Sequence, residues 1–201
     1  MNKFEKRSRD AYNKKALDYD DTFEGKFTAA YNRLLLEAVG LQDGDAVLDV
    51  ACGNGRLLKM LAGRHAIRGY GIDISENMVA QAKLQNPDME FTACSCEHLP
   101  YPDAVMDAIT VSAAYHHFPH VDIFAREALR VLKPKGKIYI AEVYYPLCYR
   151  VLFTPLLPLL KEGDVKFYSP EAIIRTLTRA GFAVPAKLLT GRIQLISARK
   201  G

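Results

Sequence analysis

Short apolar runs alternate with longer amphipathic stretches through the middle of the chain. The apolar runs have the length of buried strands and lie at 45–50, 67–74, 89–94, 106–112 and 137–143. The stretches whose apolar residues recur with helical spacing lie at 56–64, 76–85 and 121–132. Strands that alternate with helices in this way predict an α/β fold, a Rossmann-like open sheet that is mostly parallel and has helices on both faces.

Both ends of the chain depart from this alternation. Residues from about 8 to 39 predict one or two helices before the first strand. Near the C-terminus, 169–182 predicts a further helix, and the apolar residues on either side of Thr190 and Gly191 predict a hairpin. We therefore expect one antiparallel C-terminal strand to complete the sheet.

The composition is that of an ordinary globular domain. Of the 201 residues, 49% are hydrophobic and 25% are charged, and the formal net charge is +4. A chain of this length buries one core, so a single domain over 1–201 is expected. The cysteines are too sparse for a disulfide scaffold and the first residues do not resemble a signal peptide, which favours a cytoplasmic location.

Closely spaced glycines follow the first predicted strand, in the stretch VLDVACGNGRLL at 47–58. In open α/β sheets, ligands bind at the carboxyl ends of the strands, and glycine lets a ligand approach the backbone. A dinucleotide-binding turn has the pattern GxGxxG, and counted from Gly53 its third glycine falls on Leu58. A nicotinamide-dependent oxidoreductase is therefore the less favoured alternative.

Asp49, Gly53 and Gly55 resemble the acidic, glycine-spaced motif of class I S-adenosylmethionine-dependent methyltransferases, in particular the small-molecule, quinone-biosynthesis-like branch. Ala51 stands where that family has its first glycine. The resemblance implies that Asp49 holds the methionine amino group of S-adenosylmethionine. It also implies that the loop containing Ala51 and Cys52 admits the methionine and the ribose.

Two further motifs resemble the same family. Asp73 ends the second predicted strand, where the family binds the ribose, and a carboxylate can accept hydrogen bonds from two vicinal hydroxyls. Ile74 and Met78 are then expected to contact the adenine. Ser95 and Cys96 stand where the family has an adenine-contacting aspartate and an alanine.

The resemblance continues at both ends of the core. In the helix–turn–strand segment 126–142, Lys135 replaces the first of two usual glycines, while Gly136 remains. Tyr12 and Tyr19 belong to an N-terminal segment that resembles the covering helix of the family. We expect this segment to fold over the cofactor and to exclude water.

On this resemblance the single domain has four parts, which are the covering helices at 1–40, the cofactor-binding core at 45–143, an acceptor-side insertion at 144–168, and the C-terminal helix and hairpin at 169–201. The insertion contains aromatic residues that could line an apolar acceptor cavity, namely Tyr144, Tyr145, Tyr149 and Phe153. A subunit contact or ordinary core packing would explain them equally well. Its apolar stretch, 144–160, is shorter than the roughly 20 residues of a membrane-spanning helix.

Tyr115, His116 and His117 follow the fourth predicted strand and are the candidates for a general base. The alternative is that one histidine packs against the cofactor or caps the helix that begins near His120. A base is required only if the methyl acceptor arrives protonated and has a high pKa.

The expected acceptor is a small, apolar or aromatic molecule. No basic, aromatic-interleaved stripe indicates a nucleic acid. Cys94, Cys96 and His98 are too closely spaced for a structural zinc site, so no metal is expected. The main alternative is a protein that binds S-adenosylmethionine without transferring its methyl group. The sequence does not determine the oligomeric state.

Overall fold

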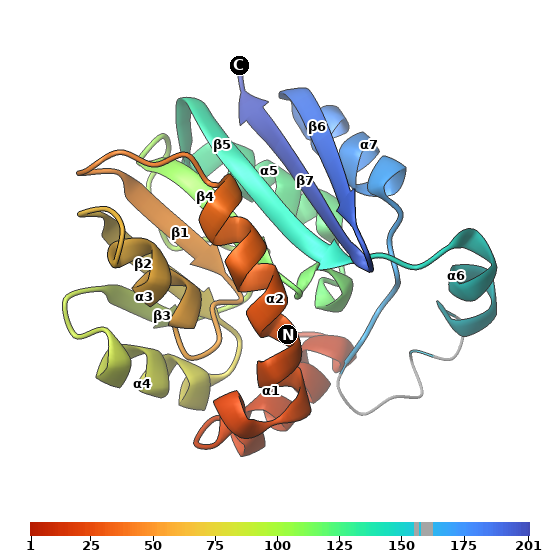
Figure 1. Ribbon diagram of the computed structural model, residues 1–201, viewed down its shortest axis with the longest axis horizontal. Coiled ribbons are helices and arrows are strands. Elements are labelled where there is room, and N and C mark those ends of the chain that lie inside the picture. The colour runs from red at the N-terminus through yellow and green to blue at the C-terminus, as the bar shows by residue number, and fades with distance from the viewer. Residues whose placement is uncertain (155–156, 158–162) are drawn as a thin grey trace.

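The computed structural model describes residues 1–154, 157 and 163–201. Within that part of the chain the strands form a seven-stranded sheet in the order β3-β2-β1-β4-β5-β7-β6 (Figure 1). The strands are β1 (Ala46–Val50), β2 (Arg68–Asp73), β3 (Glu90–Ala93), β4 (Met106–Ser112), β5 (Leu132–Val143), β6 (Phe182–Thr190) and β7 (Ile193–Lys200). Strand β7 pairs antiparallel with β5 and β6, and the other pairs are parallel. The expected open sheet with one antiparallel C-terminal strand is confirmed.

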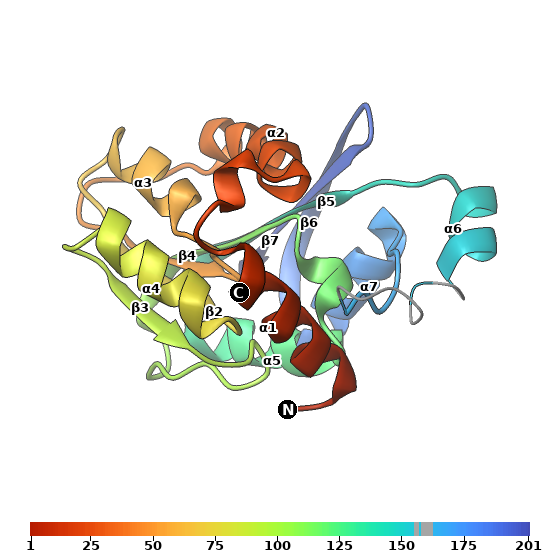
Figure 2. The ribbon, with the colours of Figure 1, turned by 90° about the horizontal axis from the view of Figure 1, so that it is seen from below.

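Helices cover both faces of this sheet. They are α1 (Lys3–Lys15), α2 (Phe23–Ala38), α3 (Arg56–Ala62), α4 (Glu76–Gln85), α5 (Val121–Val131), α6 (Leu147–Phe153) and α7 (Pro170–Ala180), with 3-10 turns η1 (Tyr19–Asp21) and η2 (Tyr115–His117). Helices α2, α3 and α4 pack against one face, and α5 and α7 pack against the other (Figures 1 and 2). None of the described helices is long and apolar enough to cross a membrane.

Strand β1 is buried along its whole length because helices cover both of its faces. Successive side chains of a strand point to opposite faces, so Leu48 and Val50 join the apolar cluster under α5 and α7. Val47 joins the cluster under α2 and α3. The same alternation places Asp49 on the face of Val47, close to the end of the strand.

Helix α1 begins at Lys3, earlier than the sequence pattern indicates. Asn2 starts it with a capping box, in which the Asn2 side chain accepts from Glu5 N and the Glu5 carboxylate accepts from Asn2 N. The buried residues of α1 are Glu5 and Ser8, so the helix has no apolar face that periodicity could detect. It lies across the carboxyl ends of the central strands (Figure 2).

Two other boundaries differ from expectation. Strand β5 begins at Leu132 rather than at residue 137, because Leu132 pairs with Met106 before an irregularity shifts the register of the ladder. The C-terminal hairpin turns at Gly191 and Arg192 rather than at Thr190 and Gly191. Gly191 has a φ of +56°, which is the left-handed conformation that a tight hairpin turn requires.

Candidate active site

The loop between β1 and α3 opens a pocket at the carboxyl ends of the strands. Ala51 and Gly53 have φ values of +58° and +54°, so both occupy the left-handed region that favours glycine. Among the described residues, only Tyr19 would lie within 4 Å of a Cβ at Gly53, at 3.9 Å. The space beside Gly53 is therefore open for a ligand. The left-handed backbone at Ala51 explains why a glycine is usual at this position.

Gly55 has a different role from Gly53. Its φ is +79°, and a Cβ there would lie 2.7 Å from Asn86 Nδ2 and 3.3 Å from Phe91 Cε1. Gly55 does not line the pocket; it lets the start of α3 pack closely against α4 and β3. The sequence motif counts Gly55 among the cofactor-binding residues; the structure shows a packing role for it, and contact with the cofactor stays a prediction.

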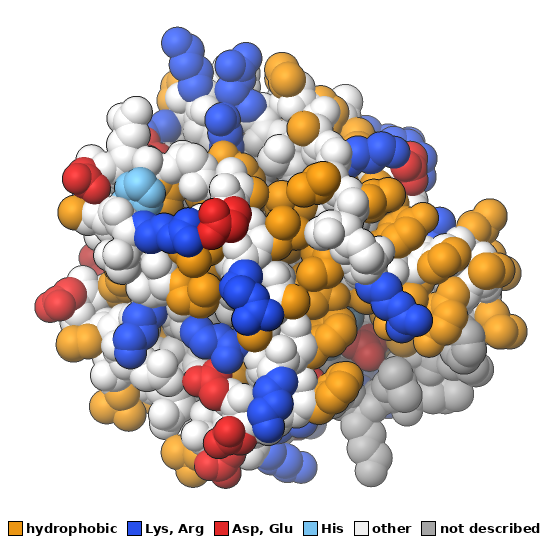
Figure 3. Space-filling view, in the orientation of Figure 1, with side chains coloured by type: hydrophobic (Ala, Val, Ile, Leu, Met, Phe, Trp, Pro, Cys, Tyr) orange, Lys and Arg blue, Asp and Glu red, His pale blue; other side chains and the backbone are white. Residues whose placement is uncertain are grey.

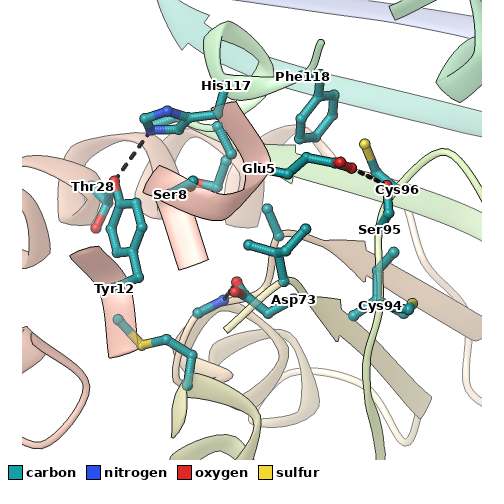
Figure 4. Close-up of a pocket in the computed structure, with 18 of the residues that line it drawn as sticks. Glu5, Ser8, Tyr12, Thr28, Asp73, Cys94, Ser95, Cys96, His117 and Phe118 are labelled. Carbon is teal, nitrogen blue, oxygen red and sulfur yellow. Dashed lines mark hydrogen bonds between the residues drawn. The ribbon is translucent and has the colours of Figure 1, made fainter. Parts of the chain in front are cut away.

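Two adjoining hollows make up the pocket, and Figure 4 shows the larger of them. The larger has a volume of about 720 Å³, its open mouth included, and is mostly apolar, while the smaller lies between the loop and α2. The hollows share five lining residues, which are Tyr19, Thr28, Ala51, Gly53 and Ser112. Because they share these residues, one elongated ligand can occupy both.

Asp49 lies in the smaller hollow and is buried. Its Oδ1 accepts a hydrogen bond of 2.7 Å from Thr110 Oγ1. Burial raises the pKa of the Asp49 carboxyl to about 7, which the bond from Thr110 only partly offsets. A cation bound beside Asp49 would favour the ionised form, so this hollow is suited to an ammonium group.

Asp73 lies in the larger hollow and joins two loops. Its Oδ2 accepts from Gly53 N and its Oδ1 accepts from Ser75 N, both at 2.9 Å. Burial raises the pKa of Asp73, and these backbone hydrogen bonds act in the opposite direction. A carboxylate oxygen has two lone pairs, so each oxygen of Asp73 can also accept from a ligand hydroxyl.

The far end of the larger hollow contains a carboxylate that sequence reasoning missed. Glu5 of α1 lines the hollow, is 8% exposed, and accepts a hydrogen bond of 2.6 Å from Ser95 Oγ (Figure 4). The chain thus has an acidic group beside the position where the family motif has an aspartate. The only sequence signal was the capping box of Asn2 and Glu5, which indicates a helix start and not a pocket.

The other predicted cofactor residues divide between the pocket and the core. The residues Ile74, Met78 and Cys96 line the larger hollow beside Asp73 and Ser95. Cys52 lines the smaller hollow, but its Sγ would lie 2.8 Å from a Cβ at Gly71, so its side chain points toward β2. Burial raises the pKa of the Cys52 thiol well above its usual value, which makes this thiol a poor nucleophile.

Tyr115, His116 and His117 occupy three different environments. Tyr115 is fully buried against Phe118, Phe124 and other aromatic rings and does not line the pocket. A role for Tyr115 as a base is therefore incompatible with its position in the core. Of these three candidates, only His117 lines the pocket.

Tyr12 and His117 meet at the wall of the larger hollow. The Tyr12 hydroxyl shares a hydrogen bond of 3.2 Å with His117 Nε2 (Figure 4). Burial lowers the pKa of His117 well below its usual value, and the neighbouring His116 acts in the same direction. His117 is therefore neutral near pH 7. His116 does not line the pocket, and its Nδ1 lies 2.9 Å from Glu142 Oε1.

The aromatic residues of the insertion form a cluster beside the histidines. The rings of Tyr145 and Tyr149 stack at 4.4 Å, and Phe167 contacts Tyr145 at 4.7 Å. The side chain of Phe153 lies outside the described part of the chain. Exposed apolar side chains cover α6, which projects from the domain (Figure 3), and include Leu147, Val151 and Leu152.

Comparison with solved structures places the fold in a known class. A chain of the complex between the Haloferax volcanii Trm112 methyltransferase activator and a methyltransferase superposes with a TM-score of 0.82 at 20% identity. The superposition covers 94% of this chain and 96% of that one. Together with the pocket at the β1 loop, this similarity defines a Rossmann-like methyltransferase fold.

Sequence comparisons give the family. A family model described as "Methyltransferase domain" matches residues 48–140. The ubiquinone/menaquinone biosynthesis C-methyltransferase UbiE of Cupriavidus necator is 32% identical, over 74% of this chain and 67% of that protein. The demethylmenaquinone methyltransferase of Renibacterium salmoninarum is 33% identical, over 65% of this chain and 55% of that protein. The chain spans about half the length of the first curated relatives that it matches.

The chain belongs to the class I S-adenosylmethionine-dependent methyltransferases, a family whose cofactor is S-adenosylmethionine. The resemblance seen in the glycine loop is therefore confirmed at the level of family and cofactor. This membership disfavours a nicotinamide-dependent oxidoreductase.

Proposed function

We propose that the chain transfers the methyl group of S-adenosylmethionine to a small, apolar or aromatic acceptor. The observation that carries this proposal is the shared wall of the two hollows, where Asp49 and Asp73 flank the open side of Gly53. One ligand that carries both an ammonium group and a ribose fits this arrangement.

The cofactor orientation follows from the charges. In the smaller hollow Asp49 would hold the amino acid end, and Asp73 would accept hydrogen bonds from the ribose hydroxyls. The adenine then lies between the apolar side chains of Ile74 and Met78 and the polar pair of Ser95 and Glu5. Tyr12, His117 and Phe118 line the remaining side of the larger hollow, where an acceptor would meet the sulfonium methyl group.

An apolar acceptor is supported by the walls that face this side. Phe118 and Pro119 line the hollow, and the cluster of Tyr145, Tyr149 and Phe167 lies beyond the histidines. The relatives named above carry names that refer to demethylmenaquinone and to ubiquinone and menaquinone biosynthesis, which are compounds of this apolar type.

The proposed reaction is direct, in-line attack of the acceptor atom on the methyl carbon. The acceptor–carbon bond forms as the carbon–sulfur bond breaks, and the sulfur keeps the electron pair, giving S-adenosylhomocysteine. Alignment in a closed site accounts for about 7–11 kcal/mol of a barrier in well-oriented systems. Tyr12 and His117 are the polar groups placed to orient the acceptor, and His116 and Tyr115 do not reach it.

Two measurements test this function. Calorimetry should detect binding of S-adenosylhomocysteine and no binding of NADH. Radiolabelled S-adenosylmethionine should then transfer its methyl group to at least one acceptor in a panel of hydroquinones, catechols and hydroxylated aromatic acids. Binding without transfer to any member of a broad panel would favour a binding protein without transfer activity. Absence of S-adenosylhomocysteine binding by the folded protein would contradict the orientation.

A further inference from the structure

His116, His117 and Asp164 bring potential ligand atoms together beside the pocket. Asp164 Oδ1 lies 3.5 Å from His116 Nε2 and 3.1 Å from His117 Nδ1. One ligand atom from each residue lies within 4.8 Å of the other two. Among the described residues, no other set of three such side chains has its ligand atoms this close together. Cys94, Cys96 and His98 do not form such a set. We propose that His116, His117 and Asp164 bind a divalent transition-metal ion.

The first argument is the geometry at His117. Its Nδ1 is buried and makes no hydrogen bond with any described residue, although Asp164 Oδ1 is only 3.1 Å away. The two atoms are close, but the angle between them does not suit a hydrogen bond. Ligand atoms around a small divalent ion have this relationship, because each points at the ion and not at its neighbour. A buried ring nitrogen that makes no hydrogen bond of good geometry also costs free energy unless something else binds it.

The second argument is the set of contacts behind the histidines. The Nδ1 atom of His116 lies 2.9 Å from Oε1 of Glu142, a carboxylate that is completely buried. The Nε2 atom of His117 lies 3.2 Å from the Tyr12 hydroxyl. Metal-binding histidines almost always engage their second nitrogen in this way, which fixes the tautomer and the ring orientation. In both rings the remaining nitrogen faces Asp164.

The third argument is that the carboxylate is held in place by the backbone. Val165 N donates a hydrogen bond of 2.9 Å to His116 O. This bond fixes the segment after Asp164 beside η2 without any contribution from the Asp164 side chain. A ligand set that is arranged before the ion arrives loses less conformational entropy on binding.

The identity of the ligands indicates the class of ion. Two imidazoles and one carboxylate suit Zn²⁺, Fe²⁺, Co²⁺ or Mn²⁺ better than Ca²⁺ or Mg²⁺, which prefer oxygen ligands. With three protein ligands, the ion keeps at least one position for water or another oxygen donor. The ion would tie the segment 163–168 to η2 at the edge of the pocket. This site does not depend on the proposed acceptor, since its test measures the ion alone.

The experiment uses Co²⁺ as a spectroscopic probe and Zn²⁺ as a competitor, with the full chain freed of any affinity tag and of bound metal. We expect one Co²⁺ per chain at micromolar concentrations, a visible absorption band typical of nitrogen and oxygen ligands, and displacement of Co²⁺ by Zn²⁺. Zn²⁺ should also raise the Tm of the protein. If His116 instead bridges Glu142 and Asp164 as a protonated imidazolium, no stoichiometric binding will be seen, and the proposal is overturned.

Variants distinguish this site from adventitious binding. Asp164→Asn and His117→Gln should each weaken Co²⁺ binding at least 100-fold, and Glu142→Gln should weaken it by about 10- to 100-fold, as expected for a partner of a ligand. The matched control is His120→Gln, since the His120 side chain is 56% exposed and lies outside the group. Unchanged binding in Asp164→Asn, or equal loss in His120→Gln, would contradict the proposal. Calorimetry with S-adenosylhomocysteine on the same variants keeps this result separate from cofactor binding.

Discussion

The carboxylate of Asp73 accepts a hydrogen bond of 2.9 Å from the backbone N–H of Gly53, across the gap between the tips of β2 and β1. The same carboxylate accepts from Ser75 N at the start of α4. One side chain therefore fixes the loop that opens the pocket and the helix that follows β2. Asp73 has two roles, because it shapes the empty pocket and, in the proposed orientation, binds the ribose.

The first prediction concerns these two roles. Asp73→Asn keeps the shape of the side chain but places an amide N–H₂ against a backbone N–H, so one of the two loop contacts is lost. We expect the affinity for S-adenosylhomocysteine to fall at least 100-fold, which corresponds to about 2.7 kcal/mol or more. Calorimetry gives the affinity, and thermal unfolding shows how much of the loss comes from the loop.

The 2′-deoxy analogue of S-adenosylhomocysteine separates the roles of Asp73. If Asp73 binds the ribose, the wild-type protein should bind this analogue more weakly than the parent compound, and the Asp73→Asn variant should distinguish the two much less. Equal affinity of the wild-type protein for both ligands would show that the ribose lies elsewhere.

The second prediction concerns Glu5 and Ser95. Glu5→Gln preserves the capping box, in which Gln can replace Glu, but removes the charge next to the expected adenine amine. Hydrogen bonds to charged groups contribute about 1.5–3 kcal/mol, so the affinity for S-adenosylhomocysteine should fall about 10- to 100-fold. Ser95→Asp in the Glu5→Gln background returns a carboxylate to the same place and should restore most of the affinity.

The control for this prediction is a cofactor analogue with unsubstituted purine in place of adenine, which lacks the exocyclic amine and adds no acceptor in its place. Its affinity should change little between the wild-type protein and Glu5→Gln. Circular dichroism should show that α1 is retained in the variant. A Glu5→Gln protein that binds S-adenosylhomocysteine as tightly as the wild type would remove Glu5 from the adenine site.

The third prediction concerns pH. Burial raises the pKa of Asp49 to about 7 in the empty protein, and an ammonium group bound beside it favours the ionised form. The affinity for S-adenosylhomocysteine should therefore increase as pH rises toward 7 and level off above it. Calorimetry between pH 5.5 and 8 measures this, with methylthioadenosine, which lacks the amino acid end, as the comparison ligand.

The stability of the empty protein should show the opposite trend. An unfolded aspartate has a pKa of about 3.9, so between about pH 4 and pH 7 the folded protein holds more protons at Asp49 than the unfolded chain does. The contribution of Asp49 to stability therefore falls as pH rises through this window. Asp49→Asn should raise the Tm at pH 8 while abolishing tight cofactor binding. A lower Tm of this variant at pH 8 would contradict the raised pKa.

The fourth prediction contrasts the two glycines of the loop. Gly55→Ala forces a methyl group against Asn86 and into a left-handed conformation, and overpacking of this kind costs about 1–3 kcal/mol of unfolding free energy. The methyl group of Gly53→Ala enters open space, so this variant should lose less unfolding free energy than Gly55→Ala. It should bind S-adenosylhomocysteine more weakly than the wild type, because the methyl group occupies space meant for the ligand. Urea unfolding and calorimetry on this matched pair check both outcomes. Equal loss of affinity in both variants would mean that Gly55 also contacts the cofactor.

The sequence by itself determined the sheet, the family and the cofactor loop. Buried strands such as 46–50 and 106–112 are apolar because helices cover both of their faces. A run of apolar residues can be recognised within the few residues of the strand itself. The motif around Gly53 is local for a similar reason, since its left-handed backbone and its approach to a ligand depend on adjacent residues. Ser75 likewise caps α4 through Met78 N, as local spacing indicates.

Only the tertiary structure decided which side chains share a pocket. Glu5 meets Ser95 across 90 positions of the chain, and Asp164 reaches His116 and His117 from beyond the insertion. These contacts leave no periodic signal, because they arise where α1 and the segment 163–168 fold over the ends of the strands. The structure also separated Tyr115 from His117, since a single 3-10 turn directs residues two positions apart to the core and to the pocket. Local physics specifies each element, but the packing of distant elements decides the chemistry of the site.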